Sequence, residues 1–430
     1  AAIPLFSILG LPKSTYAQCP DNGVYMAERT PGCSWQTQDI GPGEEFDFNV
    51  QQGVTYIWSF LQGGGNSSWD TQLSGFYEGP QTVAFFNDDF GQSLQSEVTW
   101  TSDWTGQIDV LTNRYNCAGW GSAGSATLAY RKASPAVTID QGSEINTCDG
   151  TTSLSASLTY DANSEADWAQ IGGSGTINSS GQVSGIPANS SGVFQAVASN
   201  GGCTASDNLT VYNRTPELVS VSGQGTYCGQ AVLSASGGAG GTIFWQGTVA
   251  GGTSTALASS SQIVTSSGIY YFRAYNATYG CWGDQGSVSV TIVNPTITDP
   301  VSTSICEGES VQLVGNYSNG ISPSYQWQID VGGSWTSVGN NLPNVGAIYS
   351  GDNSPVLSID GMSQTASYRL QINDAGPNCG TSNTATATVV VNSQPDALDS
   401  ITTSGSGCGS LTLTSNSDEI TGGGYTAESL

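Results

Sequence analysis

The chain has 430 residues, with 34 acidic side chains against 8 Lys and Arg, no His, and a net charge of −26. The missing His excludes Ser-His-Asp triads, Cys-His pairs and His-ligated metal sites, and the scarcity of basic side chains argues against nucleic acid and anionic membranes as partners. Ten Cys, many of them regularly spaced, indicate an oxidising compartment, so we expect a secreted, extracellular or cell-surface protein.

Residues 1–18 begin with an apolar run, AAIPLFSILGLP. The run is too short to span a bilayer, so we expect no membrane insertion. Small residues before Ala17 favour the remnant of a secretory signal peptide, cleaved after Ala17. The alternative is an extended segment that docks as an added strand in a neighbouring subunit.

Residues 19–133 form the first expected domain. Its motifs are Asp70-Thr-Gln-Leu73, Phe85-Phe-Asn-Asp-Asp89, Val98-Thr-Trp100 and Gly106-Gln-Ile-Asp-Val110. They resemble elements of the pre-peptidase C-terminal type of jelly-roll domain. The resemblance implies a non-catalytic binding or spacer module that accompanies secreted enzymes and surface proteins, and some such domains carry calcium.

Four oxygen-bearing side chains of this domain are candidate calcium ligands: Asp70, Asn87, Asp88 and Asp89. Carboxylate and amide oxygens on adjacent loops are the hard ligands that Ca2+ requires. The alternative is a turn in which the Asn and Asp side chains cap nearby backbone amides. We expect no other cofactor.

Three Cys fall in this first domain: Cys19, Cys33 and Cys117. We favour a bond between Cys33 and Cys117, which leaves Cys19 free or bonded to another chain. A bond between Cys19 and Cys33 is the alternative, because sequence alone does not decide connectivity.

The rest of the chain repeats one layout, in which a Cys, an alternating strand, a Trp, a second strand and another Cys follow in order. The copies are Cys148, Trp168, Cys203; Cys228, Trp245, Cys281; and Cys306, Trp327, Cys379. This spacing is that of a β-sandwich whose two sheets are tied by one disulfide packed against a core Trp. It predicts that the two Cys of each copy bond to one another.

Pro residues mark the boundaries of these copies, at Ser134-Pro135, Thr215-Pro216, Asn294-Pro295 and Gln394-Pro395. The expected repeats are 134–214, 215–294 and 295–392, and 393–430 is the start of a truncated fourth with Cys408. Apolar residues alternate with polar ones inside each repeat, and no helical period is long enough to predict a helix. The fold class is therefore all-β: a tandem array of disulfide-tied immunoglobulin-like β-sandwiches preceded by a jelly-roll-like β-sandwich.

Two motifs recur near the second Cys of a repeat. Ser191-Gly-Val-Phe194 precedes Asn200-Gly-Gly-Cys203, and Ser267-Gly-Ile-Tyr270 precedes Tyr279-Gly-Cys281. The repeats resemble the immunoglobulin-like and PKD-like modules of large secreted surface proteins of Bacteroidota. The resemblance implies adhesion, gliding or surface assembly, type IX secretion, and partners that are other surface proteins or copies of the chain itself.

We expect no enzyme activity, since adjacent acids such as Glu44 and Glu45 point to opposite faces of a strand and do not form a catalytic pair. The predicted function is an extracellular stalk, adhesin or filament subunit. One alternative is a non-catalytic accessory region of a secreted hydrolase. The other is a carbohydrate-binding protein, with exposed aromatic rings as a sugar platform; the candidate rings are Trp58, Trp69, Trp104, Trp120 and Trp335.

Overall fold

The computed structural model describes residues 19–118, 124–339, 346–376, 379–393, 402–404 and 412–414. The apolar N-terminal segment, Trp120, Cys408 and most of the expected fourth repeat lie outside these residues. Spatial contacts divide the chain into two compact units, one running to Glu217 and including Ala239–Gly241 and Tyr275–Gly283, the other holding the remainder. None of the described residues belongs to a helix long and apolar enough to cross a membrane.

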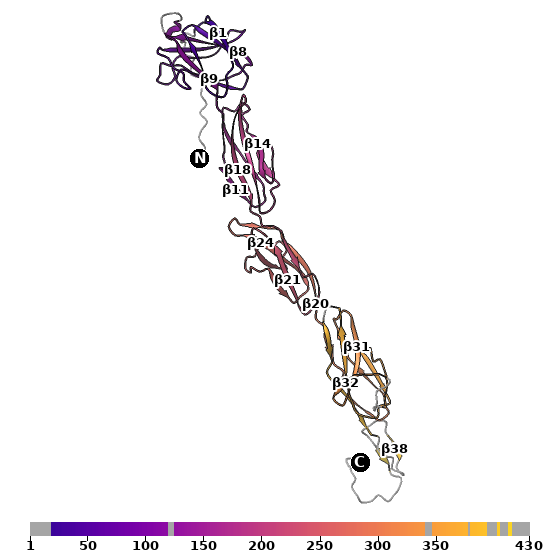
Figure 1. Cartoon of the computed structure of the whole chain (residues 1–430). Helices are drawn as coiled ribbons and strands as arrows, with labels where there is room; N and C mark the ends of the chain where they lie inside the picture. Colours follow the sequence, from indigo (N-terminus) through magenta and orange to yellow (C-terminus); the bar gives the residue numbers. More distant parts are fainter. Residues whose placement is uncertain are drawn as a thin grey trace. The chain divides into compact units, whose positions relative to one another are not determined.

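The first domain, coloured indigo to purple in Figure 1, is a jelly roll by its strand order. Its elements are β1 (Val24–Arg29), β2 (Gln36–Ile40), β3 (Glu44–Val50), β4 (Thr55–Ser59), β5 (Thr71–Tyr77), β6 (Val83–Asn87), β7 (Glu97–Thr101), β8 (Gly106–Arg114), a 3-10 turn (Tyr115–Cys117) and β9 (Ala126–Lys132). The sheets run β2-β9-β4-β7 and β3-β8-β5-β6, which is the order of an eight-stranded jelly roll, and β1 adds in parallel to β3.

Aromatic side chains fill the space between these two sheets. On β3 the alternation Glu45, Phe46, Asp47, Phe48 turns the Phe rings inward and the acids outward. Phe48 packs edge-on against Trp58, with ring centroids 5.6 Å apart. The period of two in the sequence therefore sets both the core and the acidic outer face of this sheet.

Three immunoglobulin-like sandwiches follow. Repeat 1 contains β10 (Ala136–Ile139), β11 (Glu144–Thr147), β12 (Thr152–Ser153), β13 (Ala156–Thr159), β14 (Asp167–Gly173), β15 (Thr176–Ile177), β16 (Gln182–Ser184), β17 (Ser190–Asn200) and β18 (Cys203–Asn213). Its larger sheet has the order β11-β18-β17-β14. The alternating segment 154–158 (LSASL) does not form one strand, because the chain passes from one short sheet (β12-β16-β15) to another (β10-β13) around buried Leu154.

Repeats 2 and 3 use the same plan. Repeat 2 contains β19 (Val219–Ser222), β20 (Gly225–Cys228), β21 (Ala231–Gly237), β22 (Thr242–Gly247), β23 (Ser261–Val264), β24 (Gly268–Asn276), β25 (Cys281–Trp282) and β26 (Gly286–Val293). Repeat 3 contains β27 (Thr296–Thr298), β28 (Thr303–Cys306), β29 (Val311–Val314), β30 (Asn316–Ser318), β31 (Pro323–Val331), β32 (Ser334–Ser337), β33 (Ile348–Ser350), β34 (Val356–Asp360), β35 (Ala366–Asp374), β36 (Gly380–Asn383) and β37 (Ala387–Asn392). A hairpin of β38 (Thr402–Ser404) and β39 (Thr412–Thr414) follows.

One feature of the repeats positions their Cys. The first strand of the larger sheet always runs parallel to the last strand: β11 with β18, β20 with β26, and β28 with β37. The first Cys of each repeat ends or directly follows that first strand, beside the end of the last strand, where the chain leaves the sandwich. The second Cys lies at the hairpin at the opposite end, just before or at the start of the strand that follows the turn.

The repeat Trp residues lie on equivalent strands, β14, β22 and β31, as the pattern predicts. Trp327 is fully buried and its indole N–H donates to the Ser354 carbonyl at 2.8 Å. Trp245 is half-buried and stacks on Tyr270 at 5.5 Å. These rings pack against aliphatic and aromatic side chains, and no disulfide crosses the cores of the described sandwiches.

Candidate functional site

The disulfides join one module to the next, which contradicts the predicted pairing. Among the described residues, four bonds have both partners placed: Cys19–Cys117, Cys33–Cys203, Cys148–Cys281 and Cys228–Cys379. Only the first lies within one domain, and it pairs the Cys that we expected to be free with the one expected to bond to Cys33. Cys306 is also disulfide-bonded. Cys33–Cys203, Cys148–Cys281 and Cys228–Cys379 are called the junction disulfides below.

The parallel strand explains why pairing within a repeat fails. In repeat 1, Thr147 pairs with Asn213 at the far end of β18, whereas Cys203 is the first residue of β18. The ten residue steps of that strand separate Cys148 from Cys203 by about 33 Å. A disulfide needs Cα atoms about 4.4–6.8 Å apart, so Cys148 and Cys203 cannot bond to one another and each bonds to a Cys of a neighbouring module.

The first junction joins the jelly roll to repeat 1 through Cys33–Cys203, whose Cα atoms are 5.5 Å apart. Beside it, Asn200 at the end of β17 is completely buried. Its amide donates to the carbonyls of Thr55 at 2.9 Å and Ala133 at 2.8 Å, and its oxygen accepts from the Thr55 N–H at 2.8 Å. One side chain thus satisfies three backbone groups of the preceding module and its linker.

The same hairpin makes a second polar contact with the jelly roll. Lys132, the last residue of β9, donates to the carbonyl of Gly201. Gly201 has φ 57°, and a Cβ there would lie 2.9 Å from Val54. Because the left-handed backbone and the close approach both favour Gly, the Asn-Gly-Gly motif of this hairpin fits the module before it.

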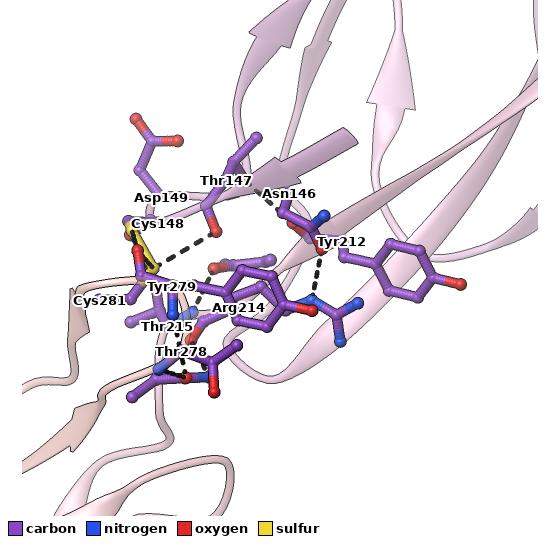
Figure 2. Close-up of a disulfide and its surroundings, with 12 residues drawn as sticks. Asn146, Thr147, Cys148, Asp149, Tyr212, Arg214, Thr215, Thr278, Tyr279 and Cys281 are labelled. Carbon is purple, nitrogen blue, oxygen red and sulfur yellow. Dashed lines mark hydrogen bonds between the residues drawn. A yellow bond between two sulfur atoms is a disulfide. The ribbon is translucent and has the colours of Figure 1, made fainter. Parts of the chain in front are cut away.

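The second junction joins repeat 1 to the β24–β25 hairpin of repeat 2 through Cys148–Cys281 (Figure 2). Arg214, in the linker, lies between two rings, with its Cζ 4.0 Å from the Tyr212 ring centroid and 4.7 Å from that of Tyr279. Its Nε donates to Asn146 Oδ1 at 2.6 Å. The guanidinium therefore bridges repeat 1 and the hairpin of repeat 2.

Linker atoms complete this second junction. The Thr215 hydroxyl donates to the carbonyl of Cys148, and the Asn276 amide donates to the carbonyl of Arg214 at 3.3 Å. Gly240 approaches so closely that a Cβ there would lie 2.6 Å from Asn189 Oδ1. The hairpin, the linker and the disulfide thus form one packed cluster.

The third junction repeats the arrangement. Cys228 is the last residue of β20 and bonds to Cys379, which precedes β36 in the hairpin of repeat 3. Cys228 pairs in register with Val293, and the Gly229 N–H donates to the Val293 carbonyl at 3.0 Å. The Cys is therefore fixed beside the point where the chain leaves repeat 2.

An acidic cluster in the jelly roll contains three of the four predicted calcium ligands. Carboxylate oxygens of Asp70, Asp88 and Asp89 lie within 4.8 Å of one another. One oxygen each of Asp70 and Asp88 is buried without a hydrogen-bond partner. Burial and the neighbouring acids raise the pKa of both carboxyls. Hard oxygen donors with uncompensated charge fit a divalent cation such as Ca2+.

Asn87 faces other partners. Its amide donates to the Asp89 carbonyl at 3.1 Å, and its Oδ1 accepts from the Glu97 N–H at 3.1 Å. The amide therefore braces the 87–89 turn and the oxygen joins it to β7 (Glu97–Thr101), while the three Asp side chains converge.

Sequence reasoning missed a second acidic cluster, on the outer face of the β3–β8 pair. Asp47 and Asp109 are directly opposite in the register. Burial, followed by the charges of Asp47, Asp21, Glu45 and Glu78, raises the pKa of Asp109 to about 7. The alternation on β3 and β8 already places acids on one face, but it does not show which residues oppose each other.

The candidate sugar platform is largely buried. Trp58 and Trp69 belong to the jelly-roll core, and Trp335 is half-buried with Arg369 Cζ 4.4 Å from its ring. Trp104 is 37% exposed. It borders a surface depression of about 240 Å3, lined by Tyr77, Pro80, Thr82, Asp103 and Trp104.

The fold and the junctions define a class: a tandem array of immunoglobulin-like sandwiches behind a jelly roll, with disulfides that join successive modules. No protein-family model and no curated protein matches the chain. Among solved structures it is similar to extracellular domains 3–5 of Drosophila OTK, at 17% identity and a TM-score of 0.27, over 60% of this chain and 97% of that one.

Two other solved structures show the same kind of likeness. The titin I-band fragment I67–I69 matches at 13% identity and a TM-score of 0.35, over 61% of this chain and all of that one. Sidekick-1 immunoglobulin domains 1–5 match at 14% identity and a TM-score of 0.22, over 87% and 80%. The fold assignment rests on the strand order and register described above.

Proposed function

We propose that the chain is an extracellular structural or adhesive surface protein: a stalk, adhesin or filament subunit. The observation that carries this proposal is the set of three junction disulfides. A bond inside a sandwich would stabilise that sandwich alone, whereas a bond between neighbours holds consecutive modules together. Such bonds persist in oxidising surroundings, and they serve a protein whose role depends on an intact array of modules.

Composition supports the same role. A net charge of −26 favours solubility of such a chain outside the cell. Tandem modules also allow many weak contacts to act together, which raises avidity without requiring a single strong site. The proposed partners are other surface proteins or further copies of this chain.

Surface location and adhesion can be tested in the producing cells. Intact cells are treated with a membrane-impermeant biotin reagent and with an antibody against the chain, and adhesion of a deletion strain is compared with that of the parent. We expect labelling without lysis and reduced adhesion or surface assembly after deletion. Labelling that requires lysis would contradict the proposal.

For the acidic cluster, we propose that Asp70, Asp88 and Asp89 bind Ca2+. The bound ion would supply charge compensation for three converging carboxylates. Titration calorimetry with CaCl2 is expected to show binding heat, and thermal unfolding with CaCl2 is expected to show a higher Tm. Both effects should be lost in Asp88→Asn. Asp39→Asn, an exposed carboxylate in the same jelly roll, is the matched control. The proposed calcium site would be refuted if the parent chain showed no binding heat and no change in Tm.

A glycan is a second candidate ligand, favoured by the exposed Trp104. Its ring lies 5.8 Å from that of Tyr77, whose hydroxyl donates to Asp103 at 2.5 Å. An exposed indole can stack on a sugar ring, and a carboxylate beside it can accept hydrogen bonds from the sugar hydroxyls. A glycan array with the parent chain and Trp104→Ala tests this; equal or absent binding would argue against it.

A further inference from the structure

The junction disulfides overlap in sequence. Cys33–Cys203 encloses the start of the Cys148–Cys281 loop, and Cys148–Cys281 encloses the start of the Cys228–Cys379 loop. Overlap of this kind, rather than a series of separate loops, changes how tension passes along the covalent structure.

The shortest covalent route from Cys33 to Cys379 bypasses most of the chain. It crosses the first junction disulfide to Cys203, follows the backbone to Cys228, and crosses the third junction disulfide. The backbone part of this route is the 25 residues between Cys203 and Cys228. Those residues contain β18, β19 and β20, which are already extended strands.

This route sets an upper limit on extension. A fully stretched residue spans about 3.5 Å, so the 25 residues allow about 90 Å between Cys33 and Cys379 even if every sandwich unfolds. Without the disulfides, the 346 residues between these positions would allow about 1,200 Å. Covalent bonds, and not the strength of the sandwich folds, therefore limit lengthening.

We propose that the junction disulfides make this chain an inextensible tether, in which β18, the following linker and β19–β20 carry the tension while the other strands of repeats 1 and 2 are shielded from it. The inference rests on the proposed surface role only for the source of the tension. The covalent routing is a property of the molecule itself and is tested separately.

Single-molecule force spectroscopy on the full chain provides the test. The chain is pulled from its N-terminus and from a click-chemistry handle installed at the exposed Thr381. In oxidising buffer we expect the stretched distance from Cys33 to Cys379 to reach no more than about 90 Å, and in excess reductant up to about 1,200 Å.

Paired Cys variants sharpen the test. With Cys33→Ser and Cys203→Ser, the shortest route from residue 33 to Cys379 becomes 98 residues. It runs back to Cys19, crosses to Cys117, and continues through Cys148–Cys281 and Cys228–Cys379, so the limit rises to about 340 Å. The matched control is Cys148→Ser with Cys281→Ser, which removes a disulfide outside the shortest route. We expect that control to extend no further than the parent chain.

The outcomes separate this inference from the proposed function. Stepwise lengthening of about 280 Å per repeat in the oxidised parent chain, as for sandwiches of about 80 residues that unfold independently, would overturn the tether. The tether would also be overturned if the Cys148→Ser, Cys281→Ser control extended as far as the Cys33→Ser, Cys203→Ser variant. Non-reducing peptide mapping of each variant verifies that the remaining disulfides have formed. Intracellular location would refute the surface role and leave the pulling result standing.

Discussion

Replacing Asn200 with Ala is expected to loosen the first junction. The side chain is completely buried and makes three hydrogen bonds to Thr55 and Ala133. The change leaves one N–H and two carbonyl oxygens of the neighbouring backbone without their partner. Cys33–Cys203 remains, so the modules stay joined while the contact between them weakens.

The size of the effect follows from the groups left unpaired. A buried polar group without a partner costs about 1–3 kcal/mol. Water can enter the space of the deleted amide and satisfy part of this need, so we expect a total loss of about 2–4 kcal/mol. This loss corresponds to about 30- to 700-fold faster exchange through opening of the junction.

Hydrogen exchange followed by mass spectrometry measures this opening directly, on peptides that cover β4 and the β17–β18 hairpin. The matched control is Asn208→Ala, on the same strand pair, because Asn208 is exposed and accepts a single side-chain bond from Gln195 at 3.0 Å. If exchange in Asn200→Ala were no faster than in Asn208→Ala, the assigned role of Asn200 would be wrong.

Three other predictions follow from the same structure. Non-reducing peptide mapping should recover the three junction disulfides, and peptides linking the two Cys of one repeat would contradict the pairing. Arg214→Ala should cost about 1–2 kcal/mol by calorimetry, with Arg214→Lys recovering only part, because Lys provides no planar group to stack between two rings; full recovery would argue against stacking. The pKa of Asp109 is raised to about 7, so it binds a proton in the folded state but not in the unfolded state between about pH 4 and 7, and stability falls as pH rises through that window. After allowance for solvent screening, Asp109→Asn should add about 1–2 kcal/mol at pH 8 and almost nothing at pH 4; equal gains at both pH values would exclude titration as the cause.

The fold class could be predicted from sequence because its signals are local. Alternation of apolar and polar residues predicted that the repeats are built of strands, and Trp spacing predicted the equivalent positions of the repeat Trp residues on β14, β22 and β31. Both signals need only the period of two and the layout of a sandwich. The eight-strand jelly roll also agrees with the expected first domain.

The disulfide pairing could not be predicted in the same way. Equal numbers of Cys per repeat fit both pairing within a repeat and pairing between neighbours, and the spacing of an immunoglobulin domain favoured the first. One signal pointed to the second: Cys148 precedes the alternating strand around Leu154 instead of lying within it. Because β11 pairs in parallel with β18, Cys148 lies at the end of the module opposite to Cys203.

The acidic cluster of Asp70, Asp88 and Asp89 could be predicted in part, because its residues lie close to predicted strand ends in the sequence. Asp88 and Asp89 are adjacent, and Asp70 lies just before a predicted strand, so a shared loop cluster was a reasonable expectation. The pairing of Asp47 with Asp109, and the insertion of Asn200 into a neighbouring module, depend on register and on contacts between modules. Neither leaves a pattern in the linear sequence.

The overlap of the three junction disulfides also bears on damage by proteases. Every peptide bond from Cys33 to Cys379 lies inside at least one of the three loops. A single cut anywhere in that range therefore leaves both fragments attached, and the cleaved molecule stays in one piece. Cleavage of one peptide bond in this range is therefore a local change in the backbone that releases no module.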